Sequence, residues 1–144
     1  MCGIAGILNT SSGPSPSEPK LSAMIGALQH RGPDGFGFYT DEVIGLAHAR
    51  LSIIDLEGGW QPIHNEDKTV WVVFNGEIFN YIELRQTLEQ DGHSFYTHSD
   101  TEVIVHLYEQ HGEEFVQHLN GQFAIALWDK TKKRLILARD RTGI

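Results

Sequence analysis

The sequence opens with Met1-Cys2-Gly3-Ile4-Ala5-Gly6-Ile7, its most informative stretch. The apolar run from Gly3 to Leu8 predicts a short buried strand that begins one residue after the cysteine. This run has no basic leading region and is interrupted by Gly3 and Gly6, so it is not a secretory signal peptide. The cysteine is therefore expected at the end of a sheet, next to the amino terminus.

Cys2 is the single cysteine of the chain, so no intrachain disulfide can form and a reducing, cytoplasmic compartment is expected. A small residue at position two allows removal of Met1, which would place a thiol and a free α-amine on the same residue. The unperturbed pKa of an α-amine is about 7.7–8.0, a value suited to a general base at neutral pH. Cys2 is thus a candidate amino-terminal nucleophile. Position alone favours the alternative, a buried apolar cysteine.

The composition is that of one compact globular domain, with 144 residues, 40% hydrophobic and 21% charged. A net charge of -8 argues against a nucleic-acid partner, because phosphate binding needs concentrated Lys and Arg. The longest strictly apolar run, Phe123 to Trp128, is far shorter than the roughly 20 residues of a bilayer span, so no membrane partner is expected. The eight histidines show no paired metal-ligand spacing, and no metal site is predicted.

Three helices are predicted. The first is indicated by apolar residues at i, i+3, i+4 and i+7, namely Leu21, Met24, Ile25 and Leu28. It follows a linker over residues 10–19 and is expected to end near His30.

The second and third helices are predicted from their ends. Asn80 can cap a helix over Tyr81–Gln90 that stops at Gly92, and Ser99 with Glu102 forms a capping-box pattern for the third.

Strands are predicted at five further segments, separated by Gly-, Asp- and Pro-containing turns: Phe36–Tyr39, Val43–Ile54, Thr69–Asn75, Gln122–Trp128 and Arg134–Ala138. The last two flank a Lys-rich turn and are expected to form a hairpin. There is no internal repeat or composition shift, so the pattern indicates one α+β domain with antiparallel strands.

Six motifs occur in order along the chain: Met1-Cys2-Gly3-Ile4-Ala5-Gly6-Ile7, Arg31-Gly32-Pro33-Asp34-Gly35, Ala47-His48-Ala49-Arg50-Leu51-Ser52-Ile53-Ile54-Asp55, Phe74-Asn75-Gly76-Glu77-Ile78, Ser99-Asp100-Thr101-Glu102-Val103 and Ala138-Arg139-Asp140-Arg141-Thr142-Gly143. Together they resemble the amino-terminal glutaminase domain of the asparagine synthetase family and its class II amidotransferase relatives. The resemblance spans residues 1–144. It implies the four-layer αββα sandwich of amino-terminal nucleophile hydrolases, with antiparallel sheets.

The resemblance also implies a reaction and its catalytic residues. Cys2 would attack the side-chain amide of L-glutamine, giving a glutamyl thioester and ammonia, after which water would release glutamate. Asn75, through its side-chain amide, and Gly76, through its backbone N–H, would form the oxyanion hole. Without the family, the Asn-Gly pair would instead predict a type I′ hairpin turn.

The residues that would bind glutamine follow from the same motifs. Arg50 would hold the α-carboxylate, because a planar guanidinium can bond it bidentately. Asp100 and Glu77 would hold the α-ammonium, and the backbone of Leu51 and Ile53 would line the pocket. The catalytic Asn75 and Gly76 also count among the substrate-binding residues.

The loop Arg31 to Gly35 is expected to close over glutamine, with Arg31 as its one candidate contact.

The resemblance implies no cofactor for this domain. ATP and Mg²⁺ belong to a synthetase domain, normally on the same chain, whose Ser-Gly-Gly-x-Asp-Ser loop does not occur here. The chain is therefore expected to be a piece lacking that carboxy-terminal domain, and a homodimer stays open. Two alternatives remain: the glutaminase domain of another amidotransferase, and a non-catalytic domain that binds glutamine or a partner.

Overall fold

The computed structural model describes residues 2–10, 13–55 and 58–143. Met1, two residues of the predicted linker and Ile144 lie outside the described residues. The elements follow one another in the order β1 Gly3–Leu8, α1 Glu18–Leu28, β2 Gly35–Thr40, β3 Ile44–Arg50, β4 Ile63–His64, β5 Val70–Ile78, α2 Tyr81–Gln90, α3 Glu102–His111, a 3₁₀ helix Gly112–His118, β6 Gly121–Asp129 and β7 Arg134–Arg139.

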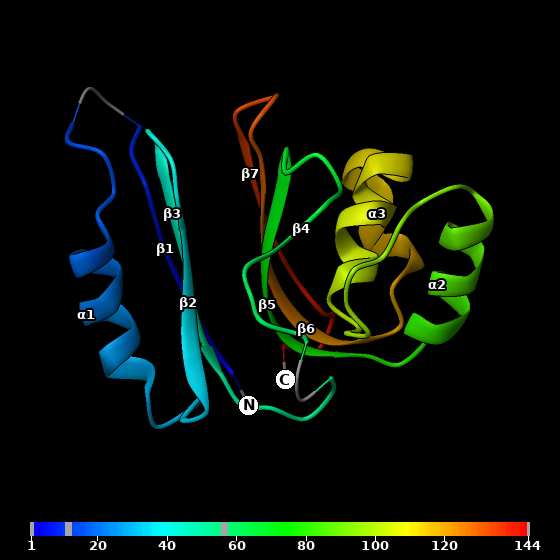
Figure 1. Cartoon of the computed structure of the whole chain (residues 1–144), viewed down its shortest axis with the longest axis horizontal. Helices are drawn as coiled ribbons and strands as arrows, with labels where there is room; N and C mark the ends of the chain where they lie inside the picture. The colour runs from blue at the N-terminus through cyan, green and yellow to red at the C-terminus, as the bar shows by residue number, and fades with distance from the viewer. Residues whose placement is uncertain (1, 11–12, 56–57, 144) are drawn as a thin grey trace.

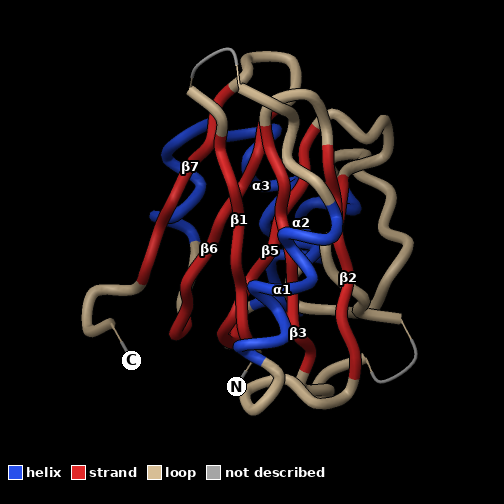
Figure 2. The backbone as a smooth tube through the Cα atoms, turned by 90° about the vertical axis from the view of Figure 1, so that its left-hand side faces the viewer, coloured by secondary structure: helices blue, strands red, loops and turns tan. Residues whose placement is uncertain are grey.

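Two antiparallel sheets face each other and are covered on their outer sides by helices (Figure 1). One sheet has the strand order β1-β3-β2 and the other β4-β5-β6-β7. Helix α1 covers the first sheet, as Figure 2 shows from the α1 side, and α2 and α3 cover the second. The predicted four-layer αββα sandwich is confirmed.

Each pair of adjacent layers has its own apolar core, because every sheet must bury both of its faces. Leu21 and Ile25 of α1 pack on Ala47 and Ala49 of the first sheet. Between the two sheets lies a small cluster: Ile44, Leu46, Val73, Ala126 and Trp128. The largest cluster lies between the second sheet and the helices α2 and α3, and includes Val72, Phe74, Leu88, Ile104 and Phe115.

The strand register determines what lies beside the cysteine. In the antiparallel pair of β1 and β3, Gly3 is opposite Ala49, so Cys2 comes next to the end of β3 at Arg50. On the second sheet β5 pairs with β6, with Gly76 opposite Phe123. The predicted strand Gly3–Leu8, the helix Tyr81–Gln90 and the β6–β7 hairpin are confirmed.

The predicted capping box was wrong. Helix α3 begins at Glu102, with Thr101 at the N-cap. The Glu102 carboxylate accepts from the backbone N–H groups of Tyr96 and Thr97 rather than that of Ser99. The Glu102 side chain therefore holds the segment that precedes α3. The spacing of Ser99 and Glu102 in the sequence could not show this contact.

Other helix details also differ from expectation. Met24, predicted on the apolar face of α1, is 37% exposed, because the sheet contacts mainly Leu21 and Ile25. Asn80 precedes α2 but makes no capping hydrogen bond. Its side chain instead bonds the backbone of Asn120 and His118, tying the start of α2 to the chain before β6.

Two strand predictions need correction. The segment 43–54 was predicted as one strand, but β3 ends at Arg50. The strand predicted over 69–75 continues to Ile78, so Asn75 and Gly76 lie within β5 and form no hairpin turn. The short β4 and the 3₁₀ helix were not predicted. In the described ranges, no helix has the length and apolar character needed to cross a bilayer.

Candidate active site

The Cys2 thiol is half-buried and is held against the segment that follows β3. The Leu51 N–H donates to Sγ at 3.3 Å, and the thiol donates to the Leu51 carbonyl oxygen at 3.5 Å. Arg31 Nε donates to the carbonyl oxygen of Cys2 at 3.1 Å. Strand β1 and these three contacts fix the position of the thiol.

All eight residues predicted for the site line one pocket, and they come from four separate parts of the chain. They are Cys2, Arg50, Leu51, Ile53, Asn75, Gly76, Glu77 and Asp100. The same pocket is lined by eight residues to which the sequence assigned no role: His48, Ile54, Gly59, Gln61, Phe74, Ser99, Thr101 and Gln122. The structure thus brings together every predicted site residue, from both sheets and from the segment before α3.

Asn75 and Gly76 present polar groups to the pocket from the second sheet. Gly76 has φ +158°, and a Cβ atom there would lie 2.0 Å from the carbonyl oxygen of Gln122. Only glycine allows β5 and β6 to approach this closely. Asn75 Oδ1 is buried and has no hydrogen-bond partner among the described residues, so this oxygen can accept from a donor group of a ligand.

Arg50 supplies a positive charge to the pocket although its side chain is only 3% exposed. Its guanidinium carbon lies 4.7 Å from the ring centroid of Trp60, a cation–π distance, and Nη2 donates to the carbonyl oxygen of Asp55. These contacts hold the guanidinium in one orientation. A fixed, buried cation of this kind favours an anionic group of a ligand.

Asp100 supplies the opposite charge. Its carboxylate is 5% exposed and accepts from the Ile78 N–H at 2.9 Å. Burial raises the pKa of Asp100, the bond from Ile78 opposes this, and the nearby Glu77 raises the pKa further. A cationic group bound between these two carboxyl groups would relieve both effects. The pocket therefore offers separate places for a negative and a positive group.

The loop from Arg31 to Gly35 does not line the pocket, and its closure over glutamine stays a prediction. Arg31 bonds the backbone of Cys2, and Asp34 Oδ2 accepts from the Ser52 N–H at 2.7 Å. In this structure the loop holds together the two segments that carry the thiol and the end of β3.

Two supporting residues were missed by sequence reasoning. Gln61 is buried, accepts from the Phe74 N–H at 2.6 Å and donates to Thr101 Oγ1 at 3.3 Å, so it joins β5 to the start of α3. Asp55 accepts from the backbone N–H of His98 at 2.8 Å. Asp55 is the last residue of one of the six sequence motifs, so its role in the site could have been suspected. Gln61 lies in none of the six motifs, and no local sequence pattern indicates its role.

The fold is that of known amidotransferases. The glutamine phosphoribosylpyrophosphate amidotransferase from B. subtilis superposes with a TM-score of 0.74 at 23% identity, over 97% of this chain and 37% of that one. A second structure, described as the allosteric regulatory enzyme of purine biosynthesis, gives a TM-score of 0.72. These likenesses define the fold class.

The family follows from the sequence comparisons. A family model described as a glutamine amidotransferase domain matches residues 1–144, and the chain belongs to this family. Over 146 residues it is 45% identical to asparagine synthetase (glutamine-hydrolyzing) 1 of Bacillus subtilis, covering all of this chain and 23% of that protein. It is 48% identical over 144 residues to asparagine synthetase (glutamine-hydrolyzing) 2 of Arabidopsis thaliana, covering 25% of that protein. The chain thus spans about a quarter of these relatives' length.

Proposed function

We propose that this domain hydrolyses the side-chain amide of L-glutamine to L-glutamate and ammonia, with Cys2 as the nucleophile. The observation that carries the proposal is the convergence of the Cys2 thiol, the Arg50 guanidinium and the Asp100 carboxylate in one pocket. Glutamine has an α-carboxylate and an α-ammonium at one end and an amide at the other. Arg50 and Asp100 match the charged end, and Cys2 with Asn75 matches the amide.

The first half of the reaction forms the thioester. Removal of Met1 leaves the α-amine of Cys2 free to take the thiol proton. Sγ bonds to the amide carbon, and the carbonyl electron pair moves to oxygen, where the Asn75 amide and the Gly76 N–H stabilise the negative charge. The C–N bond then breaks, the amine returns its proton to the leaving nitrogen, and ammonia departs.

The second half regenerates the enzyme. Water adds to the thioester carbon while the α-amine takes one of its protons, and the same oxyanion donors stabilise the new intermediate. The C–S bond breaks, the thiolate recovers a proton, and glutamate is released. The reaction needs only this chain's own groups and water.

The relatives suggest where the ammonia goes. The identities of 45% and 48% are with proteins named asparagine synthetases, and this supports asparagine as the final product. We place the ATP- and Mg²⁺-dependent activation of aspartate in a synthetase domain on the same chain, and the setting in the cytoplasm. A different ammonia acceptor would leave the glutaminase chemistry unchanged.

The proposal is tested by measuring glutamate and ammonia release from glutamine with protein whose amino terminus has been verified by intact mass. The protein with free Cys2 should form equal amounts of both products without ATP. A matched sample that retains a residue before Cys2 should stay folded by circular dichroism and lose nearly all activity, because its base is blocked.

Two outcomes would contradict the proposal. Near-normal turnover by the blocked protein would exclude the α-amine as the base. Glutamine binding without hydrolysis by the protein with a free amino terminus would instead support the non-catalytic alternative.

A further inference from the structure

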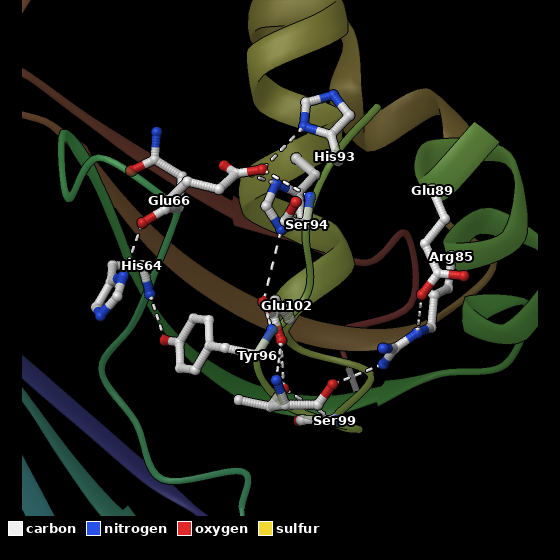
Figure 3. A network of polar contacts seen from close by, with 12 residues as sticks. His64, Glu66, Arg85, Glu89, His93, Ser94, Tyr96, Ser99 and Glu102 are labelled. Atoms are coloured by element: carbon white, nitrogen blue, oxygen red, sulfur yellow. Dashed lines mark hydrogen bonds and ion pairs between the residues drawn. The ribbon is translucent and has the colours of Figure 1, made fainter. Parts of the chain in front are cut away.

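A second cluster of polar side chains lies outside the pocket, on the outer side of the second sheet. It consists of Glu66 in the β4–β5 loop, His93 after α2, and His106 and Glu109 on α3. One potential ligand atom from each lies within 4.8 Å of all the others. In Figure 3 the side chains of Glu66 and His93 point toward each other from two different segments. We name these four residues the Glu/His cluster.

The distances within the Glu/His cluster suit a small cation. His106 Nδ1 lies 3.1 Å from Glu109 Oε2 and 3.5 Å from Glu66 Oε2, and His93 Nδ1 lies 3.5 Å from the same Glu109 oxygen. Ligands bound tetrahedrally to Zn²⁺ at about 2.0–2.1 Å are roughly 3.3 Å apart. Both histidines therefore present Nδ1 to a common point at nearly the required separation.

The ligand atoms are oriented by neighbouring groups. Asn65 Nδ2 donates to Glu109 Oε1 at 2.7 Å and the Ser94 N–H donates to Glu66 Oε1 at 2.8 Å, so each carboxylate keeps Oε2 for the centre. On the far side of the His106 ring, Nε2 lies 3.6 Å from Glu102 Oε1, and both side chains are fully buried. At this distance the two groups attract each other electrostatically but form no hydrogen bond, and His106 Nε2 has no hydrogen-bond partner among the described residues.

The charge of the surroundings also favours a cation. Carboxylate oxygens of three glutamates lie within 3.6 Å of the His106 ring nitrogens: Glu66 at 3.5 Å, Glu102 at 3.6 Å and Glu109 at 3.1 Å. Three carboxylates thus surround one imidazole ring, and the repulsion among them falls when a positive charge lies between them. A proton supplies one charge, whereas a divalent ion supplies two and removes more of the repulsion.

We propose that the Glu/His cluster binds one divalent transition-metal ion of the Zn²⁺ class through His93, His106, Glu109 and Glu66. Two imidazoles and two carboxylates suit Zn²⁺ and similar ions, and they suit Mg²⁺ poorly because it prefers six oxygen ligands. The ion would join the β4–β5 loop and the segment after α2 to α3. The ion would have a structural function, because it would hold α3 in place. Helix α3 begins two residues after Asp100, which lines the pocket. No local pattern in the sequence indicates this site, because its ligands are spread from residue 66 to residue 109.

The test is a titration of tag-free, chelator-stripped protein with Zn²⁺, followed by calorimetry and thermal unfolding. Cys2→Ala serves as the background, because the free thiol and α-amine of Cys2 could themselves bind Zn²⁺. We expect one ion per chain and a raised melting temperature, with no such change from Mg²⁺. Co²⁺ should give visible bands of a tetrahedral site without a thiolate charge-transfer band.

Glu66→Gln and His93→Asn should each weaken Zn²⁺ binding by about 100-fold or more, exceeding the 10–100-fold typical of a residue that only orients a ligand. Both side chains are partly exposed, so these variants are expected to fold. The matched controls are Glu114→Gln and His111→Asn, two exposed residues outside the cluster, and they should bind normally. Absence of stoichiometric binding, or equal binding by all four variants, would overturn the proposal and leave a network of hydrogen bonds and ion pairs.

Discussion

His48 and His106 are the same side chain at equal burial, 1% and 0% exposed, yet their surroundings favour opposite charge states. His48 lines the pocket on β3. Burial lowers its pKa to about 4, a bond with the Phe74 backbone opposes this, and the positive Arg50 lowers it further. His106 is surrounded by glutamates that raise its pKa to about 9 in spite of burial.

Burial alone therefore does not determine the charge state of a histidine, because charged neighbours can shift its pKa in either direction. The pocket combines a fixed cation, Arg50, with a buried acid, Asp100, and so suits a zwitterion such as an amino acid. The Glu/His cluster, together with Glu102 beside His106, brings three carboxylates together and suits a cation. The two regions should therefore respond to different perturbations, and the predictions below separate them.

The largest expected effect is a double dissociation between the two regions. Cys2→Ala should abolish glutamine hydrolysis and leave Zn²⁺ binding at the Glu/His cluster intact. Glu66→Gln should do the reverse, because it lies outside the pocket. Glutamate release and calorimetric Zn²⁺ titration on the same preparations check this. Loss of both properties in either variant would mean that the two regions are not independent.

Within the pocket, Arg50→Ala should chiefly weaken the binding of glutamine. Leaving the α-carboxylate without its buried partner should cost about 2–5 kcal/mol, seen as a higher KM with a smaller change in kcat. Arg50→Lys is the matched control, because it keeps the charge and loses the bidentate geometry, and should be intermediate. A purely kcat effect would assign Arg50 to the chemical step.

Asn75→Ala should act on the chemical step instead. Removing one oxyanion donor typically lowers the rate by about 10²–10³, because that bond forms fully only in the transition state. Single-turnover kinetics should show slow thioester formation with glutamine affinity nearly unchanged. If Asn75→Ala and Arg50→Ala gave the same kinetic pattern, the division of roles between the two residues would be wrong.

The smallest effect is on stability as a function of pH, in metal-free protein. As pH falls from 6.5 toward 4, the unfolded chain binds a proton at His48 that the folded chain excludes, so stability should decrease. The folded chain binds a proton at His106 more tightly than the unfolded chain does. The resulting stabilisation is fully present below pH 6.5 and is lost as the pH rises toward 9. Each change should be about 3 kcal/mol at most.

Denaturant unfolding across this range should therefore show a maximum near pH 6.5. His48→Asn should flatten the acid side alone. Saturating Zn²⁺ should raise stability most on the alkaline side, because the ion competes there with fewer protons. A monotonic pH profile in both conditions would contradict the opposite assignments of His48 and His106.

Much of the pocket could be predicted because its residues stand in contiguous motifs. Cys2 was recognisable from the motif that it opens rather than from its position alone, and Arg50, Asn75 and Asp100 each lie in a short segment of defined order. The local elements were also predictable where periodicity was clear, as in α2 and the β6–β7 hairpin. The Asn-Gly pair was ambiguous, because the same dipeptide suits a turn and a close strand contact.

The sequence by itself determined the family, the candidate nucleophile and most of the secondary structure, because these depend on residues adjacent in the chain. Only the tertiary structure decided that Arg31 supports Cys2, that Gln61 joins β5 to the start of α3, and that Glu102 lies behind His106. It also brought together the Glu/His cluster, from residues 66 to 109. The physical reason is that strand pairing and helix packing determine which distant side chains meet, and no local pattern encodes that convergence.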